Sequence, residues 1–180
     1  MSAKSKASGS SRPATASGLA AKGAPRDDGI VQHFPGLSLT GWLERLERLH
    51  PSTIELGLDR VRRVKDALGL DPAFPLIVVG GTNGKGSTCA YLEAILGAAG
   101  YKTGLYTSPH LLRYNERVRI AGQESTDAAL VQAFEKIDTA SGDISMTYIE
   151  LGKLGEMAQF VEAGVNVAIL EVGLGGRLDA

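Results

Sequence analysis

A glycine-rich segment with one lysine and three hydroxyl side chains is the part of this sequence best suited to chemistry. It reads Gly80-Gly81-Thr82-Asn83-Gly84-Lys85-Gly86-Ser87-Thr88 and follows an apolar run at residues 74–79. Glycine permits the close backbone approach that phosphate oxygens need, and a helix beginning after the turn adds positive partial charge. Lys85 can reach the β- and γ-phosphates, and a hydroxyl from Ser87 or Thr88 can face them or their Mg²⁺. We therefore predict a phosphate-binding loop here.

This segment departs from the usual phosphate-loop pattern, which places glycine at position 79 and serine or threonine at position 86. Those positions hold Val79 and Gly86. The simpler interpretation is a glycine-rich turn between a strand and a helix. The order of strand, turn, lysine and helix favours the phosphate site over that interpretation.

A carboxylate at the end of a second apolar run is the next candidate. Residues 165–170 are almost entirely apolar and are followed by Glu171. If the runs at 74–79 and 165–170 are parallel strands, Glu171 and the glycine-rich segment lie at the same edge of one sheet. A carboxylate in that position can hold Mg²⁺ directly or through water. The alternative is a solvated carboxylate at a strand end, and the neighbouring phosphate loop favours the metal role.

A polar loop lies between these two segments. It reads Tyr106-Thr107-Ser108-Pro109-His110-Leu111 and continues into Asn115-Glu116-Arg117. Alone, this composition indicates a functional or tightly turned loop. A single histidine such as His110 is more often a hydrogen-bonded structural residue than a ligand.

The apolar periodicity predicts the elements that must position these groups. Helices are expected from Ser38 or Thr40 to His50, and over 58–68, from the glycine-rich segment to 99, and over 127–139 and 148–163; strands are expected at 74–79, 102–106, 117–120 and 165–170. In the third helix Leu92, Ile95 and Leu96 are expected to be buried. Two fully buried strands separated by helices predict an α/β protein with a P-loop-type, mostly parallel sheet flanked by helices.

Composition excludes several classes of protein. The 180 residues are 43% apolar, which is enough for a hydrophobic core. Of the 19 basic and 20 acidic residues, five basic and no acidic ones lie in residues 1–26, so the remainder carries 14 basic against 20 acidic side chains. Nucleic-acid binders concentrate positive charge on the folded domain, and this chain does the reverse. No run reaches the roughly 18 apolar residues of a membrane span.

The first 36 residues are expected to form a disordered, low-complexity tail. Alanine, serine and glycine supply 17 of the first 30 residues, and no apolar periodicity is present. Such a segment cannot bury enough surface to offset its ordering entropy. Its basic, acid-poor start also fits an organelle transit peptide, but it has few arginines and no large apolar face.

One cysteine is present, Cys89, one turn into the helix expected after the glycine-rich segment. A single cysteine cannot form an internal disulfide, which indicates a reducing compartment. A packing role in the helix is favoured over a reactive one.

Three motifs in order resemble the folylpolyglutamate synthase family, a branch of the Mur-type ATP-dependent amide ligases. They are Gly81-Thr82-Asn83-Gly84-Lys85-Gly86-Ser87, then Thr107-Ser108-Pro109-His110-Leu111 with Asn115-Glu116-Arg117-Val118, then the run from Glu171 to Ala180. The segments 142–148 and 50–58 resemble in particular the bifunctional bacterial members, which are dihydrofolate synthases as well. The resemblance runs from about residue 40 to residue 180, and the loop form with Gly86 is the family's own.

The resemblance implies a role for each matched position. ATP is implied at Gly81, Thr82, Asn83, Gly84, Lys85, Gly86 and Ser87, with Lys85 as the catalytic cation, and Mg²⁺ is implied at Ser108 and Glu171. The dihydropteroate pocket is implied at Glu55, Leu56 and Gly57, at Thr147, Tyr148, Ile149 and Glu150, and at Leu178, Asp179 and Ala180. Ile149 stands where an aromatic residue is common in the family, so the stacking partner of the pterin is in question.

The implied reaction is ATP-dependent ligation of L-glutamate to dihydropteroate and to reduced folates. ATP phosphorylates the substrate carboxylate, because oxide is a poor leaving group, and the amine of glutamate then attacks the acyl phosphate. Lys85 and Mg²⁺ spread the charge of the transferring phosphoryl group. The implied partners are these small molecules, with no nucleic acid and no membrane, in a cytoplasmic protein that is a monomer at full length.

The family's greater length implies that residues 37–180 are the N-terminal part of its ATP-binding domain. The C-terminal glutamate ligase domain would then be absent and the fragment catalytically inactive. Its sheet would be interrupted after the strand ending at Glu171, leaving that strand as an unpaired edge. Two other interpretations stay open: a Mur-type peptidoglycan-precursor ligase, and a nucleotide-binding module without catalysis.

Overall fold

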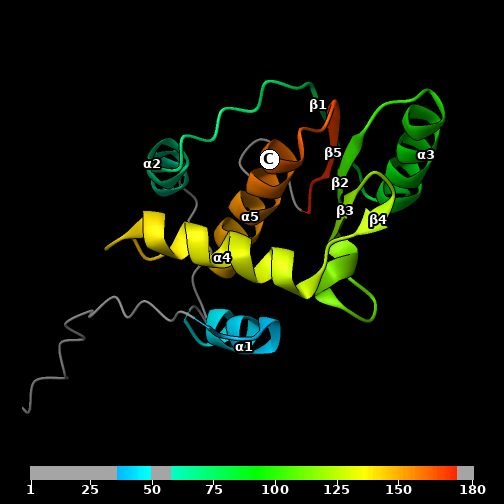
Figure 1. Cartoon of the computed structure of the whole chain (residues 1–180). Coiled ribbons are helices and arrows are strands. Elements are labelled where there is room, and N and C mark those ends of the chain that lie inside the picture. Colours follow the sequence, from blue (N-terminus) through cyan, green and yellow to red (C-terminus); the bar gives the residue numbers. More distant parts are fainter. Residues whose placement is uncertain (1–35, 50–57, 174–180) are drawn as a thin grey trace, which may run out of the picture. The chain divides into compact units, whose positions relative to one another are not determined.

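The structure is a computed structural model that describes residues 36–49 and 58–173 (Figure 1). Its helices are α1 (Leu39–Leu49), α2 (Asp59–Ala67), α3 (Lys85–Ala98), the short 3₁₀ helix η1 (Tyr114–Arg117), α4 (Asp127–Ser141) and α5 (Tyr148–Ala163). Its strands are β1 (Leu76–Val79), β2 (Thr103–Tyr106), β3 (Val118–Ile120), β4 (Gln123–Glu124) and β5 (Val167–Glu171). The predicted α/β class is confirmed, and each predicted element is present to within a few residues.

The strands form one mixed sheet in the order β1-β5-β2-β3-β4. β5 pairs in parallel with β1 on one side and with β2 on the other, and an antiparallel hairpin of β3 and β4 extends the sheet beyond β2. The expectation that the strand ending at Glu171 is an unpaired edge is therefore wrong. Within the described residues, the outer strands are β1 and β4.

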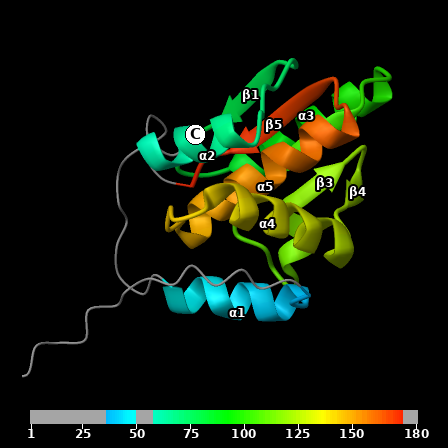
Figure 2. The ribbon, with the colours of Figure 1, turned by 60° about the vertical axis from the view of Figure 1, so that its left-hand side comes forward.

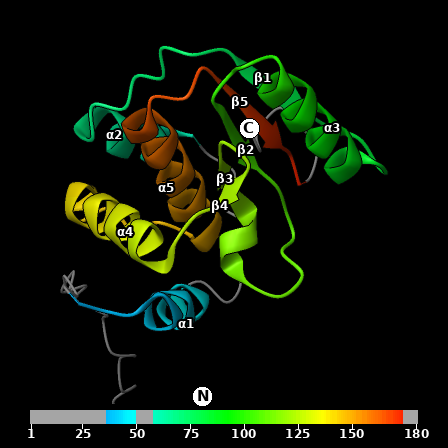
Figure 3. The same cartoon turned by 45° about the vertical axis from the view of Figure 1, so that its right-hand side comes forward.

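Helices cover both faces of this sheet. α3 packs on one face, while α4 and α5 lie on the other (Figures 1 and 3). Beneath α3, a small core joins strand residues to one face of the helix. The strand residues are Ile77, Val79, Leu105 and Ile169, and the helix residues are Cys89, Leu92 and Leu96. Burial raises the pKa of the Cys89 thiol to about 11, with the charge of Glu171 as a second cause, so the thiol stays neutral and serves packing.

The larger core lies on the opposite face. There α4 contacts both α5 and α1 and lies between them (Figure 2). Trp42, Phe134 and Phe160 are its largest fully buried side chains. Close approach of α5 to the sheet depends on Gly104, because a Cβ atom at that position would lie 2.7 Å from the Phe160 ring.

Two burial predictions are wrong. Leu76 and Val78 of β1 are 44% and 48% exposed, because β1 is an outer strand and no described helix covers that face of it. Ile95 is 63% exposed, since α3 meets the sheet through the face that carries Cys89, Leu92 and Leu96. No helix among residues 36–49 and 58–173 is long and apolar enough to cross a membrane.

Candidate functional site

The glycine-rich segment forms an exposed loop between β1 and α3. Its residues 80–84 are exposed, and α3 begins at Lys85. Gly84 has φ +76°, a left-handed conformation that favours glycine, and this residue turns the chain into the helix. The carbonyl oxygen of Gly84 accepts hydrogen bonds from the backbone N–H and the hydroxyl of Thr88, both at 2.9 Å. The hydroxyl of Thr88 is therefore engaged with the helix, which makes Ser87 the better candidate of the two to face a phosphate or its Mg²⁺.

Lys85 lies between the loop and the end of β5. Its ammonium group donates to the carbonyl of Gly81 at 3.1 Å and lies 3.9 Å from Oε1 of Glu171. The Lys85 and Glu171 side chains are only 18% and 6% exposed. A cation and a carboxylate thus meet at the point where a phosphate loop would hold its ligand.

The register of the sheet places Glu171. Val79 at the end of β1 is opposite Glu171, and Tyr106 at the end of β2 is opposite Leu170. Glu171 therefore lies between the loops that follow β1 and β2. Its Oε2 accepts a hydrogen bond from the backbone N–H of Ser108 at 3.1 Å, so the two predicted metal ligands are brought together.

This pair of side chains fits Mg²⁺ chemically. A carboxylate and a hydroxyl are hard oxygen donors, and Mg²⁺ at nucleotide sites commonly takes one or two protein oxygens with phosphate and water completing the shell. No group of three or more His, Cys, Asp or Glu side chains with metal-binding geometry occurs among the residues that the structure describes. The donor set therefore matches a nucleotide-bound Mg²⁺ better than a cage made wholly of protein.

The loop from Thr107 to Arg117 is held together by hydrogen bonds to the Glu116 carboxylate and from the Arg117 guanidinium. Glu116 accepts hydrogen bonds from the backbone N–H groups of Leu111, Leu112 and Arg113, at 2.8, 2.9 and 2.8 Å, and these bonds lower the pKa of its carboxyl. His110 accepts a hydrogen bond at Nδ1 from Nε of Arg117 at 2.8 Å. The structural interpretation of His110 is thus the one that the geometry favours.

The predicted pocket residues at the start of α5 divide into two kinds. Thr147 and Glu150 form a capping box: the Thr147 hydroxyl accepts from the Glu150 N–H at 3.2 Å, and Glu150 accepts from the Thr147 N–H at 2.8 Å. Arg60 of α2 also donates to Glu150, at 3.1 Å. Ile149 is 53% exposed and Tyr148 is half-buried, so these two side chains are the ones available to a ligand. The remaining predicted pocket residues, Glu55 to Gly57 and Leu178 to Ala180, lie outside the described residues.

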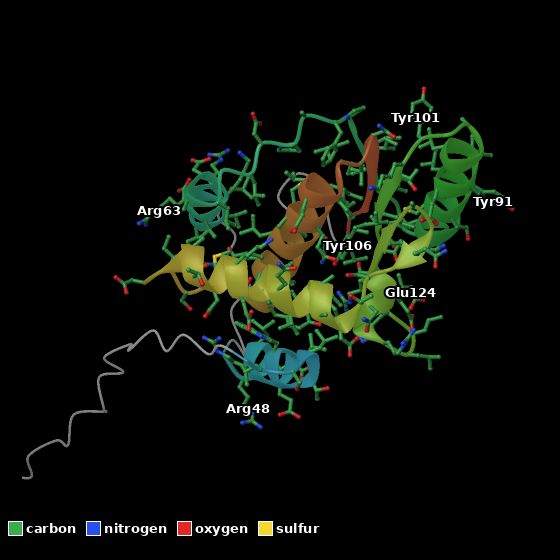
Figure 4. All side chains as sticks on the ribbon, in the orientation of Figure 1. Arg48, Arg63, Tyr91, Tyr101, Tyr106 and Glu124 are labelled. Carbon is green, nitrogen blue, oxygen red and sulfur yellow. The ribbon has the colours of Figure 1, made fainter. Side chains whose placement is uncertain are left out.

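Three groups near this site, of which Tyr106 and Glu156 are buried, were given no individual role from the sequence. Tyr106 lies on the face of the sheet that α4 and α5 cover (Figure 4), and Arg117 lies beside it. Glu156 of α5 is buried, and its Oε1 has no hydrogen-bond partner among the residues that the structure describes. Burial raises the pKa of Glu156 well above its usual range, against the opposing charges of Lys153 and Arg117. The apolar periodicity of residues 148–163 gave no signal for Glu156, because residue 156 does not share a helix face with Leu151 and Leu154.

A separate cavity of about 430 Å³ lies against α3 and the β3–β4 hairpin. Glu93 and Arg119 line it and form an ion pair at 3.2 Å. Burial raises the pKa of Glu93, while Arg119 opposes the change. None of the predicted site residues lines this cavity, so we assign no part of the phosphate site to it.

The chain is similar to known proteins along most of its length. It is 57% identical over 154 residues to the dihydrofolate synthase/folylpolyglutamate synthase of Escherichia coli, a match covering 84% of this chain and 36% of the relative. The Haemophilus influenzae protein of the same name is 50% identical over 143 residues, covering 79% and 32%. The chain thus spans about a third of the length of these relatives. No protein-family model matches it.

Solved structures of folylpolyglutamate synthases are also similar to this chain. Escherichia coli FolC in complex with DHPP and ADP superposes with a TM-score of 0.77 at 55% identity, over 81% of this chain and 35% of that one. The Yersinia pestis bifunctional enzyme complexed with AMPPNP and a Mn ion gives 0.76 at 55% identity, over 81% and 36%. The Mycobacterium tuberculosis folylpolyglutamate synthase complexed with ADP gives 0.72 at 31% identity, over 78% and 33%.

Proposed function

Because the chain belongs to the dihydrofolate synthase/folylpolyglutamate synthase family, we propose that it supplies the nucleotide and metal site of an ATP-dependent ligase. The ligase adds L-glutamate to dihydropteroate and to reduced folates. The observation that carries this proposal is the meeting of Lys85, Glu171 and Ser108, which three separate strand ends bring to one edge of the sheet. We assign this site to residues 37–180 and treat residues 1–36 as a tail outside it.

The phosphate loop holds the nucleotide in this proposal. Backbone N–H groups of residues 81–87 and the N-terminus of α3 face the phosphates, as in other loop-to-helix phosphate sites. Lys85 exchanges its hydrogen bond with the Gly81 carbonyl for one with a β- or γ-phosphate oxygen. Its positive charge then stabilises the negative charge that develops on the transferring phosphoryl group.

Glu171 and Ser108 would hold the metal ion. Oε2 of Glu171 is already oriented by the Ser108 N–H, and Oε1 faces Lys85. When Mg²⁺ is bound there, it neutralises part of the phosphate charge and aligns the nucleotide. The burial of Glu171 keeps competing water away from this carboxylate.

The acceptor site lies toward the start of α5. Ile149 and Tyr148 provide the apolar contacts for a pterin, while Thr147 and Glu150 hold the helix end through their capping box. The FolC complex with DHPP and ADP supports folate chemistry over peptidoglycan-precursor ligation for this site. The proposed setting is the cytoplasm, which suits the free thiol of Cys89.

Two experiments test the proposal. The 180-residue chain is titrated with ADP and Mg²⁺ by calorimetry, and we expect saturable binding that requires the metal for full affinity. In parallel, the matched segment of the Escherichia coli enzyme is replaced by the corresponding segment of this chain. This chimera should release ADP only when L-glutamate and dihydropteroate are both present. Nucleotide binding with no glutamate-dependent turnover would favour a non-catalytic nucleotide module instead.

A further inference from the structure

The side chain of Arg117 is in contact with four aromatic rings. Nε donates to Nδ1 of His110 at 2.8 Å, and Nη1 lies 3.5 Å from the Tyr106 hydroxyl, the outer limit of a hydrogen bond. The guanidinium carbon lies 5.2 Å from the centre of the Tyr114 ring and 5.9 Å from that of Tyr148. One cation therefore joins the end of β2, the polar loop, η1 and the first residue of α5.

The backbone of Arg117 closes the same loop. Its carbonyl accepts a hydrogen bond from the N–H of Thr107 at 3.0 Å. The next residue after Thr107 is Ser108, whose N–H is bonded to Glu171. The position of Ser108 against Glu171 therefore depends on a loop whose two ends meet at Arg117.

The hydrogen bond with His110 also determines which imidazole nitrogen carries the proton. Nδ1 accepts from Arg117, so the proton of a neutral imidazole is on Nε2. The forked guanidinium directs Nε to His110 and Nη1 to the Tyr106 hydroxyl, while its central carbon lies 5.2 Å and 5.9 Å from the centres of the Tyr114 and Tyr148 rings. A lysine at this position could place one charge there but could not do both.

Tyr106 provides a second connection between Arg117 and Ser108, one of the two residues that we assign to the metal. Burial, followed by the charge of Glu156, raises the pKa of Tyr106 to about 12, so its phenol stays protonated at neutral pH. Hydrogen bonding with Arg117 and with the Ser108 side chain opposes that rise. The Tyr106 hydroxyl thus lies between the guanidinium and the serine hydroxyl that we assign to the metal.

We propose that Arg117 is a positioning residue for the ligase reaction: it holds the Ser108 loop against Glu171 at one end and against Tyr148 of the acceptor site at the other. This inference rests on the proposed function. It predicts that loss of the guanidinium weakens metal binding at a distance, although Arg117 itself touches no metal. Outer residues that orient metal ligands commonly contribute 10- to 100-fold to metal affinity or activity.

The test compares Arg117→Lys and Arg117→Met with Arg113→Met in the chimera. Arg113 lies in the same loop, but its guanidinium forms an exposed ion pair with Glu124, so it is the matched control. We expect both Arg117 variants to lower kcat by about 10- to 100-fold and to raise the Mg²⁺ concentration for half-maximal rate, with the KM for L-glutamate unchanged. Arg113→Met should match the parent chimera in all three quantities.

A binding measurement separates positioning from a general structural role. Mn²⁺ binding in the presence of ADP is followed by electron paramagnetic resonance on the 180-residue chain and its Arg117→Lys variant, after circular dichroism has shown both to be folded. A Mn²⁺ affinity about tenfold or more weaker in the variant supports the inference. Unchanged Mn²⁺ affinity, or an Arg117→Lys chimera with parental rate and Mg²⁺ dependence, overturns it. A parent chimera that shows no glutamate-dependent turnover would instead count against the proposed function.

Discussion

The ammonium group of Lys85 lies 3.9 Å from a carboxylate oxygen of Glu171, although one residue begins α3 and the other ends β5. Both side chains are largely buried, so water screens the attraction between the two charges only weakly. A nucleotide with Mg²⁺ would insert a negative phosphate beside the lysine and a positive ion beside the carboxylate. Lys85 is thus opposite in charge to the phosphate, and Glu171 is opposite in charge to the metal ion. Removing the lysine charge should therefore affect phosphoryl transfer, whereas removing the carboxylate charge should affect the Mg²⁺ requirement.

Lys85→Ala should abolish ligation in the chimera. The variant removes the cation that faces the β- and γ-phosphates, and loss of one such group commonly costs about 100-fold or more in kcat. The rate of glutamate-dependent ADP release measures the effect, with Lys136→Ala as the control because Lys136 forms an exposed ion pair with Glu162 on another face. Retention of most of the activity by the Lys85 variant would remove the phosphate-loop assignment.

Glu171→Gln should affect the metal rather than the acceptor. The amide oxygen can still accept the hydrogen bond from the Ser108 N–H, but the charge that attracts Mg²⁺ is gone. We expect kcat to fall about 10- to 100-fold and the required Mg²⁺ concentration to rise, with little change in the KM for dihydropteroate. Steady-state kinetics over a Mg²⁺ series provide the measurement. A normal rate at ordinary Mg²⁺ would leave Glu171 as a buried strand-end carboxylate with no role in metal binding.

The chimera should use both dihydropteroate and a reduced folate, and Ile149 should matter to both. Replacing this exposed apolar side chain with aspartate in Ile149→Asp puts a charge where we expect the pterin, so both KM values should rise together. The control is Ile95→Asp, which changes an exposed isoleucine of α3. Activity on reduced folate alone would reject the dihydrofolate synthase half of the proposal.

Glu156→Gln should stabilise the chain at high pH more than at low pH. Burial raises the pKa of Glu156 in the folded state, so folding takes up a proton once the pH exceeds the unfolded value of about 4.3. The stability of the parent therefore falls as the pH rises toward the folded pKa, whereas a glutamine adds no such dependence. Thermal unfolding from pH 5 to pH 8 should show a growing difference in melting temperature between Glu156→Gln and the parent. Each kcal/mol of difference in the free energy of unfolding corresponds to about 2–4 °C.

The control for this experiment is Glu162→Gln on the same helix, where the carboxylate is exposed and pairs with Lys136. Its melting temperature should differ from that of the parent by the same small amount at every pH. A gap between parent and Glu156→Gln that stays constant or narrows as the pH rises would contradict the assignment of a raised pKa.

The elements were predictable because their signals are local. Thr147 and Glu150 mark a helix start three residues apart, and the capping box forms as such a pair predicts. The meeting of Lys85 and Glu171 followed from a general property of parallel sheets, in which strand carboxyl ends share an edge. These inferences needed no knowledge of which strand lies beside which.

The predictions that were wrong depend on contacts between residues distant in sequence. The position of β5 between β1 and β2 is a long-range pairing, and residues 165–170 look the same in a central strand as in an outer one. Ile95 has the spacing of a buried residue, but burial also requires a surface opposite it. The contacts of Arg117 depend on how residues 107–117 fold back, which no periodic pattern reports.

The central place of β5 also has a consequence for the order of folding. β1 and β2 are synthesised before β5 and do not pair with each other. Both pair with residues 167–171, which are synthesised only after η1, the β3–β4 hairpin, α4 and α5. Until β5 is present, one edge of β1 and one edge of β2 have no partner strand. Unpaired strand edges can pair with other chains, so aggregation competes with folding during this interval. The same docking event delivers the carboxylate of Glu171 to Lys85, so a chain unable to complete its sheet also lacks a charge-matched phosphate site. The insertion of β5 between β1 and β2 thus completes the sheet and the nucleotide site in the same step.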